Sequence, residues 1–285
     1  MENNKKLILL HEKASSGDSN SQLLLGIYFA DTLKQYEDSF KWLTMSAEQE
    51  NTIAQFKLGE CYLHGKGVPK NSSKGFKWLL KAATKGYAEA QLLVSTCYFS
   101  ADGVKKSSKL GFGWLLKAAQ QGNVKGMNGV ALCYLNGLGT VSNLDEATHW
   151  FEKAVEKGNK GSLISLGECY IKRDQMELAF KIFKIAADNN NVKAQLFVAN
   201  MLLNGEGVEC NEEEAIHYLE KAAELGSKDA VNKLAELQEN HKKVDDYINS
   251  MKNKSGILPN LGIVFWIICI LVALGGVYLY QISNN

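Results

Sequence analysis

The sequence predicts an all-α fold: a right-handed α/α solenoid of about six helical hairpins plus a capping helix, followed by a single transmembrane helix. Three observations lead to this prediction: a tryptophan that recurs every 36 residues, a second column of small residues with the same period, and an uncharged apolar stretch near the C-terminus. Two prolines against 25 glycines favour helices separated by short turns. With 285 residues and 46% apolar content, the chain is long and apolar enough for a sizeable core.

The tryptophan column marks the second helix of each hairpin, called helix B. Its members are Trp42, Trp78, Trp114, Trp150, Ile182 and Tyr218. The small-residue column marks the first helix, called helix A, and consists of Ala54, Ala90, Gly126, Ser162, Ala194 and Ala230. Apolar residues four, seven and eight positions after each of the first five members give the periodicity of an amphipathic helix.

The spacing between the two columns shows where the repeat varies in length. From each helix B column to the next helix A column the distance is 12 residues at all six junctions. From helix A to helix B it is 24 residues in four units, but 21 in the first and 20 in the fifth. Length variation is therefore confined to one loop, as in stacked solenoids.

The loops between helix A and helix B carry glycines and capping residues. Glycine pairs that begin at Gly65, Gly137 and Gly205 are expected to end helix A and reverse the chain, and Asp102-Gly103-Val104 is a weaker copy. The expected N-caps of helix B are Asn71, Ser107, Asn143 and Asn211. Glu146 and Glu214 follow two of these by three residues, the spacing of a capping box.

These residues resemble the Sel-one-like repeat family, a relative of the tetratricopeptide repeats. Units of that family carry Ala, Leu-Gly and Tyr in helix A, a Gly-x-Gly-Val loop, and Trp-Tyr with Lys-Ala-Ala in helix B. The resemblance covers residues 19–240 and is strongest in the second unit, whereas units one and five lack the glycine loop. The expected domains are an N-terminal capping segment (1–18), units at 19–50, 52–86, 88–122, 124–158, 160–189 and 192–226, a partial unit (228–240), and a capping helix with juxtamembrane linker (241–256).

Residues 257–282 are predicted to form the transmembrane helix. The segment 261–280 has no charged side chain and spans about 30 Å as a helix. Lys242, Lys243, Lys252 and Lys254 precede it and no basic residue follows, so the positive-inside rule places the repeats in the cytoplasm of a single-pass, tail-anchored protein. The alternative is a buried core helix, although such helices are seldom apolar on all sides for this length.

Residues typical of catalysis, metal binding or cofactor binding are not found in a recognisable arrangement. Cys61, Cys97, Cys133 and Cys169 recur once per unit and are expected to be free and buried, because equivalent positions of stacked units lie too far apart for a disulfide. The histidines lack the spacing of a zinc site, and the glycine loops follow helices rather than strands. A net charge of +1 argues against nucleic acid as a partner, and no small-molecule substrate is evident.

Candidate binding residues follow from the resemblance, because helix A lines the concave surface of tetratricopeptide-like stacks. The residues three and six positions after the small-residue column point away from the buried face of helix A. Five such residues are candidate protein contacts, with core packing as the alternative: Leu93, Thr96, Leu132, Phe197 and Asn200. Charge is also segregated, since residues 55–126 hold twelve lysines and three acids, whereas residues 200–240 hold ten acids and three lysines. This segregation either steers a partner or forms a solvated outer face.

The resemblance implies a non-catalytic scaffold or adaptor that binds a protein or peptide in the groove of the repeats and is anchored to a membrane by residues 257–282. One alternative is a bacterial immunity protein that neutralises a toxin or an enzyme. A hydrolase is a further alternative, and it requires a nucleophile and a base that converge in the groove. A purely structural role predicts self-assembly with no other partner bound.

Overall fold

The computed structural model describes residues 2–255, and this part of the chain forms fourteen α helices, one 3₁₀ turn and no strand. The prediction of an all-α solenoid is confirmed for these residues. The elements are α1 (Glu2–Ser15), α2 (Ser19–Asp31), α3 (Tyr36–Glu48), α4 (Thr52–His64), α5 (Ser72–Thr84), α6 (Ala88–Ser100), α7 (Ser108–Gln120), α8 (Val124–Asn136), α9 (Leu144–Glu156), η1 (Lys160–Ser162), α10 (Leu163–Lys172), α11 (Met176–Asp188), α12 (Val192–Asn204), α13 (Glu212–Glu224) and α14 (Lys228–Ser255).

The predicted transmembrane segment, 257–282, lies outside the described residues. Among residues 2–255, no helix combines the length and the apolar character needed to cross a bilayer. The partial unit expected at 228–240 and the capping helix expected after it form one continuous helix, α14, of 28 residues.

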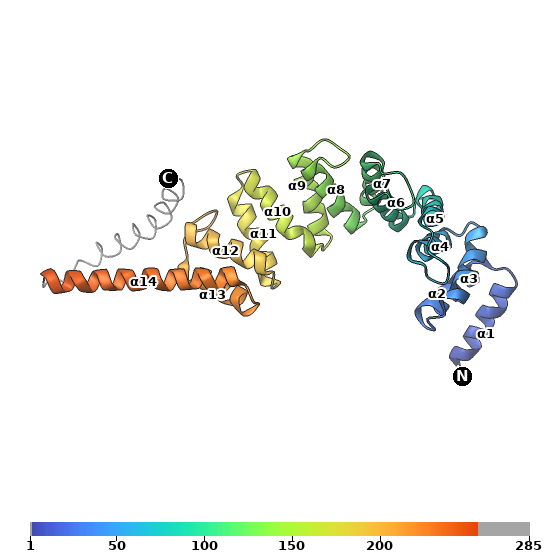
Figure 1. Ribbon diagram of the computed structural model, residues 1–285, viewed down its shortest axis with the longest axis horizontal. Coiled ribbons are helices and arrows are strands. Elements are labelled where there is room, and N and C mark those ends of the chain that lie inside the picture. The colour runs from blue at the N-terminus through green and yellow to red at the C-terminus, as the bar shows by residue number, and fades with distance from the viewer. Residues whose placement is uncertain (1, 256–285) are drawn as a thin grey trace. The chain divides into compact units, whose positions relative to one another are not determined.

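The described part of the chain divides into two compact units, with the boundary between Ile182 and Phe183. In the first unit each helix packs on the next one along the chain, so that α2 with α3, α4 with α5, α6 with α7, and α8 with α9 form hairpins (Figure 1). In the second unit α12 and α13 form a hairpin, and α14 packs on α13. Six of the helices are helix B, and each places its member of the tryptophan column at the middle of 13 residues.

The predicted N-caps of helix B are confirmed. The Asn71 side chain accepts a hydrogen bond from Lys74 N at 3.0 Å, and Ser107, Asn143 and Asn211 cap α7, α9 and α13 in the same way. The reciprocal half of the predicted capping box does not form, because the Asn143 backbone N–H donates to Tyr134 O and the Glu214 carboxylate pairs with Lys184 at 2.7 Å. The cap residue therefore closes its hairpin by a bond to helix A.

The two glycines of each loop have different roles. Gly65, Gly137 and Gly205 end helix A in the left-handed conformation, as predicted, and Ala101 takes this conformation in the weaker copy with φ 60°. The second glycine allows a close approach to the preceding repeat: a Cβ on Gly67 would lie 2.0 Å from Tyr36 O. A Cβ on Gly103 would clash with Ser72 O in the same way, so the weaker copy keeps the contact that joins two repeats.

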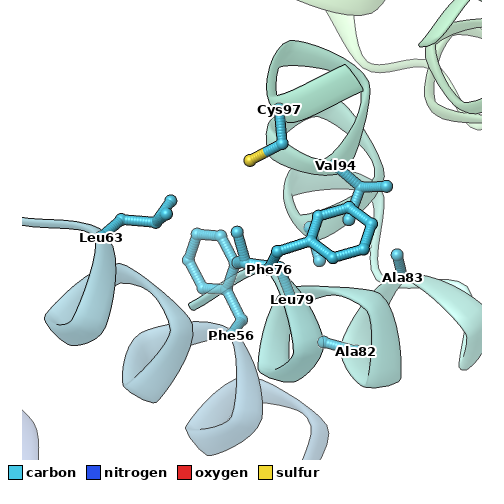
Figure 2. Close-up of a cluster of buried hydrophobic side chains, with 9 residues drawn as sticks. Phe56, Leu63, Phe76, Leu79, Ala82, Ala83, Val94 and Cys97 are labelled. Carbon is cyan, nitrogen blue, oxygen red and sulfur yellow. The ribbon is translucent and has the colours of Figure 1, made fainter. Parts of the chain in front are cut away.

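The core lies between consecutive helices, as the cluster around Phe76 shows (Figure 2). Leu79, Ala82 and Ala83 of α5 are at most 1% exposed and pack with Val94 of α6, so the small alanines let the helices approach closely. Consecutive repeats are also joined by edge-to-face aromatic pairs with centroids 5.3–5.4 Å apart, a favourable geometry: Phe40–Tyr62, Phe76–Tyr98 and Phe112–Tyr134.

Candidate protein-binding surface

Three of the predicted contact residues lie on helices A of the first unit. Leu93 of α6 is half-buried and packs against the core cluster of Figure 2, which agrees with the alternative that it serves the core. Thr96, also on α6, is exposed, and its hydroxyl donates to Leu92 O at 3.0 Å. Leu132 of α8 is 39% exposed. Thr96 and Leu132 are thus accessible to a partner.

The other two predicted contact residues lie on α12 in the second unit. Phe197 is half-buried and stacks on Phe183 with ring centroids 4.4 Å apart and an interplanar angle of 11°. Lys193 Nζ lies 5.6 Å from the centroid of the same ring. Much of the Phe197 side chain is therefore engaged within its own unit, whereas Asn200 is exposed. Whether any of the five residues binds a partner stays a prediction.

A pocket of about 190 Å³ opens at the first junction between two helices A. Its walls come from α2, α3 and α4, and they include Lys57 and Glu60, which lie three and six residues after Ala54 of the small-residue column. Ligand pockets for small molecules usually measure about 300–1,000 Å³. The pocket is therefore smaller than most small-molecule sites and is large enough for one side chain of a peptide.

The charges that line this pocket are balanced, and one buried polar group beside it has no partner. Lys57 Nζ and Glu60 Oε2 form an ion pair at 3.0 Å, and Asp31 and Lys66 add one further charge of each sign. Ser39 of α3 is 1% exposed, and its Oγ makes no hydrogen bond in the described structure. A buried hydroxyl without a partner costs about 1–3 kcal/mol, and this oxygen is covered from solvent, so a ligand in the pocket would bond to it only if the pocket wall moved.

Six consecutive segments of the chain match the Sel1 repeat family model: residues 19–51, 52–87, 88–123, 124–159, 161–191 and 192–227. The chain belongs to the Sel1 repeat family. The resemblance predicted from the two columns is thereby confirmed, and the short first and fifth segments are those in which the loop lacks its glycines.

Solved structures with the Sel1-like repeat (SLR) fold agree with this assignment. A protective antigen of uropathogenic Escherichia coli with an SLR fold has a TM-score of 0.75 and 26% identity, over 95% of this chain and 64% of the antigen. The chain thus spans just under two thirds of the antigen's length. A Sel1 repeat protein from Oxalobacter formigenes has a TM-score of 0.68 and 28% identity, over 74% of this chain and 88% of that protein.

More distant likenesses carry no argument about function. An immunity protein from Pseudomonas aeruginosa has a TM-score of 0.40 and 14% identity, over 72% of this chain and 81% of that protein. The comparison with curated proteins gave no match.

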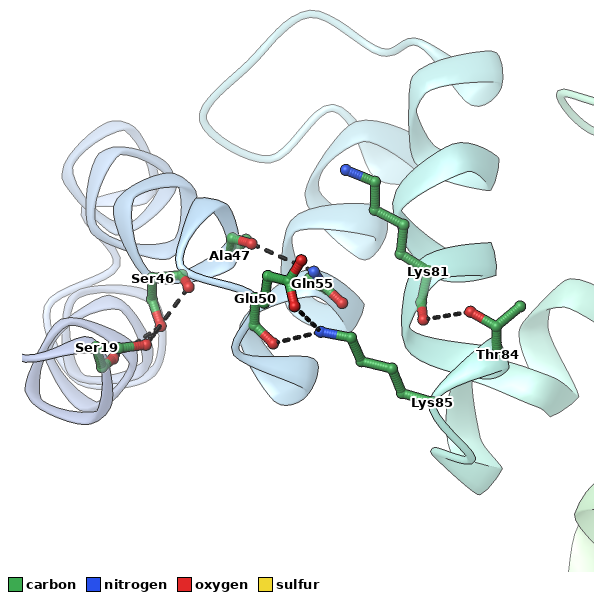
Figure 3. Close-up of polar contacts among 8 residues, drawn as sticks. All are labelled: Ser19, Ser46, Ala47, Glu50, Gln55, Lys81, Thr84 and Lys85. Carbon is green, nitrogen blue, oxygen red and sulfur yellow. Dashed lines mark hydrogen bonds and ion pairs between the residues drawn. The ribbon is translucent and has the colours of Figure 1, made fainter.

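A set of buried glutamines, which was not predicted from the sequence, joins the Sel1 repeats. Gln55 Nε2 donates to Ala47 O at 3.3 Å, from helix A to the preceding helix B (Figure 3). Equivalent bonds run from Gln91 to Ala83 and from Gln195 to Ala187, and Gln22 bonds to Ala14 of α1. The signal was the residue that follows the small-residue column, which is glutamine in these repeats. Each of these carbonyl groups also accepts a backbone N–H from the turn that follows its helix, as Ala47 O does from Glu50 N, so the glutamine adds a second hydrogen bond at the helix end.

The repeated cysteines are part of the packing of the Sel1 repeats. Cys61, Cys97, Cys133 and Cys169 are free and buried, as predicted, while Cys210 is free and exposed. Burial raises the pKa of the Cys61, Cys97 and Cys133 thiols to about 11. A thiol with so high a pKa is a poor nucleophile at neutral pH. Among the described residues, no group of three metal-ligating side chains comes together.

Proposed function

We propose that this protein is a non-catalytic scaffold that binds a protein or peptide partner on the face formed by its helices A and is held at a membrane by residues 257–282, with the repeats in the cytoplasm. Sel1 repeat proteins are generally protein-interaction scaffolds. The observation that carries the proposal is the pocket between α2, α3 and α4, which has the size of one side chain and borders the unpaired hydroxyl of Ser39.

A crosslinking pull-down of the full-length chain from intact membranes tests partner binding. We expect the wild-type chain to recover one stoichiometric protein, and Ala30→Trp, which fills the pocket, and Leu132→Glu to reduce that recovery. Val141 is an apolar residue in a loop, 84% exposed, so Val141→Glu is a matched control that should leave recovery unchanged. Recovery of no partner, or equal loss with all three variants, would contradict the proposal.

The membrane part of the proposal is tested separately on the full-length chain. Two arginines within an uncharged span of about 20 residues oppose insertion, because a charged side chain is costly at the centre of a bilayer. We expect the double variant Ile268→Arg, Val272→Arg to leave the membrane fraction, whereas wild type requires detergent for extraction. A wild-type chain that is soluble without detergent would overturn the anchor and leave the binding surface intact. No specific observation favours the immunity or hydrolase alternatives.

A further inference from the structure

Gly113, which lies inside a helix of the first unit, has no packing neighbour that requires a glycine. Glycine in a helix interior is destabilising relative to alanine, so its presence needs a cause. Five interior glycines have one, since a Cβ on any of them would lie within 2.7–3.0 Å of a neighbouring side chain: Gly26, Gly59, Gly75, Gly111 and Gly129. A Cβ on Gly113, in the middle of α7, would meet nothing within 4 Å.

The surface around Gly113 is basic. Lys109 and Lys117 lie four residues before and after it, so all three residues share one face of α7. Both lysines are exposed, and Lys117 Nζ lies 4.4 Å from the centroid of the Trp114 ring. Leu110 adds an apolar side chain that is 51% exposed. The helix therefore offers open backbone between two cations, with an apolar group beside them.

The equivalent helix of the preceding repeat, α5, is also basic. Its Lys74, Lys77 and Lys81 are exposed, and neither α5 nor α7 contains an acidic residue. Three other lysines of this unit pair with carboxylates: Lys41 with Asp38, Lys57 with Glu60, and Lys85 with Glu50, the last of which is drawn in Figure 3. Among the described residues, the lysines at 74, 77, 81, 109 and 117 form no such pair. Both helices pack on α6.

We infer that this surface binds an acidic peptide segment of a protein partner, and that the backbone of the bound segment approaches α7 at Gly113. The surface is here called the lysine face, and it consists of Lys74, Lys77 and Lys81 of α5 with Lys109, Gly113 and Lys117 of α7. The inference rests on the proposed scaffold function and adds a second surface, on helices B. Carboxylates of the segment complement lysines that lack an acidic neighbour. Close approach over a glycine favours a peptide, because lipid headgroups need no gap in a helix surface.

The test uses full-length protein in detergent and a fluorescently labelled 16-residue peptide of glutamate, alanine and leucine, with a second peptide that has glutamine for every glutamate. Fluorescence anisotropy measures affinity at low and high salt. We expect the glutamate peptide to bind at least about tenfold more tightly than the glutamine peptide, and to weaken as salt screens the charges. Gly113→Gln should reduce affinity about tenfold while raising the melting temperature, because the substitution blocks the approach and improves helix propensity.

Two further variants separate the lysine face from general positive charge. The double variant Lys109→Gln, Lys117→Gln should weaken binding of the glutamate peptide. Lys125 is exposed on the neighbouring helix A, α8, so Lys125→Gln is the matched control and should leave affinity unchanged. Equal effects of these variants, or binding that Gly113→Gln does not change, would overturn the inference.

The remaining outcomes concern the occupant. Absence of binding by the glutamate peptide overturns the inference. If phosphatidylserine vesicles compete with the peptide and Gly113→Gln does not change that competition, the surface binds a membrane and the inference is overturned. If the protein self-associates and the lysine variants abolish the self-association, the surface binds a second copy and the inference is likewise overturned. If the pull-down partner is lost with Leu132→Glu but the peptide does not bind, only this inference fails. If the peptide binds as expected and no partner is recovered from membranes, only the proposed function fails.

Discussion

Gln49 donates a hydrogen bond from its Nε2 to Oε1 of the buried Gln22 at 2.7 Å. Gln121 does the same for Gln91 at 2.8 Å. In both cases the C-cap residue of helix B donates to the oxygen of a glutamine whose nitrogen already bonds to the preceding helix. Both polar atoms of the buried amide are therefore hydrogen-bonded, and the amide joins three successive helices.

Gln195 lacks this partner, because Leu225 stands where Gln121 stands three repeats earlier. Its Oε1 is buried and makes no hydrogen bond in the described structure. We expect Leu225→Gln to supply the missing donor and to stabilise the second unit by about 1 kcal/mol. Urea unfolding measures the change in the free energy of unfolding.

The control for that substitution is Leu225→Ala. Leu225 is 52% exposed, so the alanine variant removes the leucine without adding a donor. An equal stability gain in both variants would show that the hydrogen bond contributes nothing. The oxygen of Gln55 is unpaired for a related reason, because Lys85, at the position equivalent to Gln121, donates instead to Glu50 O at 2.7 Å (Figure 3).

Ala101 is the one helix A C-cap of the four long loops that is not glycine. Its φ of 60° costs about 1–2 kcal/mol for a residue with a Cβ. A glycine at this position avoids the cost, but part of the gain in stability is offset because glycine raises the conformational entropy of the unfolded chain. We expect Ala101→Gly to stabilise the protein by about 0.5 kcal/mol and Gly137→Ala to destabilise it by about 1 kcal/mol. Thermal unfolding of both variants tests the opposite signs.

Substitution of the second glycine of the loop is expected to reduce stability more than substitution of the first. A Cβ on Gly67 would lie 2.0 Å from Tyr36 O and would force two repeats apart, whereas a Cβ on Gly86 would meet nothing within 4 Å. Both residues have positive φ, 70° and 93°, so both alanine variants share the backbone strain. We expect Gly67→Ala to cost about 2 kcal/mol more than Gly86→Ala. Similar unfolding midpoints for the two variants would mean that the junction adapts to the side chain.

Stability should also depend on alkaline pH through the buried cysteines. Cys61, Cys97 and Cys133 have pKa values of about 11 in the fold, against an ordinary value of 9.0. The neutral thiols therefore contribute stability that is present below pH 9 and is lost as pH rises toward 11, because the unfolded chain then releases protons that the folded chain retains.

Comparison of wild type with Cys133→Ala tests this linkage. The variant should show a shallower fall in the free energy of unfolding between pH 9 and 11, whatever its stability at pH 7. Thiol labelling at pH 8 gives an independent measure, with peptide mapping by mass spectrometry. Cys210 is exposed and should react first, whereas rapid labelling of Cys133 would show that its burial is not maintained in solution.

Most of the fold could be predicted from the repeat period of the sequence. Residues such as Trp78 and Trp114 recur in register, and the fixed 12-residue turn leaves little freedom for stacking. The N-caps at Asn71 and Asn143 were predictable for the same reason, because each depends on a residue and its nearest neighbours in the chain.

Contacts between distant positions were not predictable in the same way. The unpaired Ser39 and the glutamine bonds depend on which atoms meet across helices, and the Lys184–Glu214 pair that prevents the capping box spans 30 residues. Periodicity placed Leu132 and Leu93 on the same face of helix A, but in the structure Leu132 is exposed whereas Leu93 packs against the core. Sequence identified the candidate face, and packing decided which of its side chains are accessible.

Site-specific photocrosslinking from position 132 in the full-length chain, within intact membranes, tests the central claim most directly. The account predicts a single crosslinked protein partner from position 132, and none from a crosslinker at position 141 in an exposed loop. Crosslinks from position 132 to no protein, or the same set of proteins from both positions, would contradict the claim that the face of helices A is a specific binding surface.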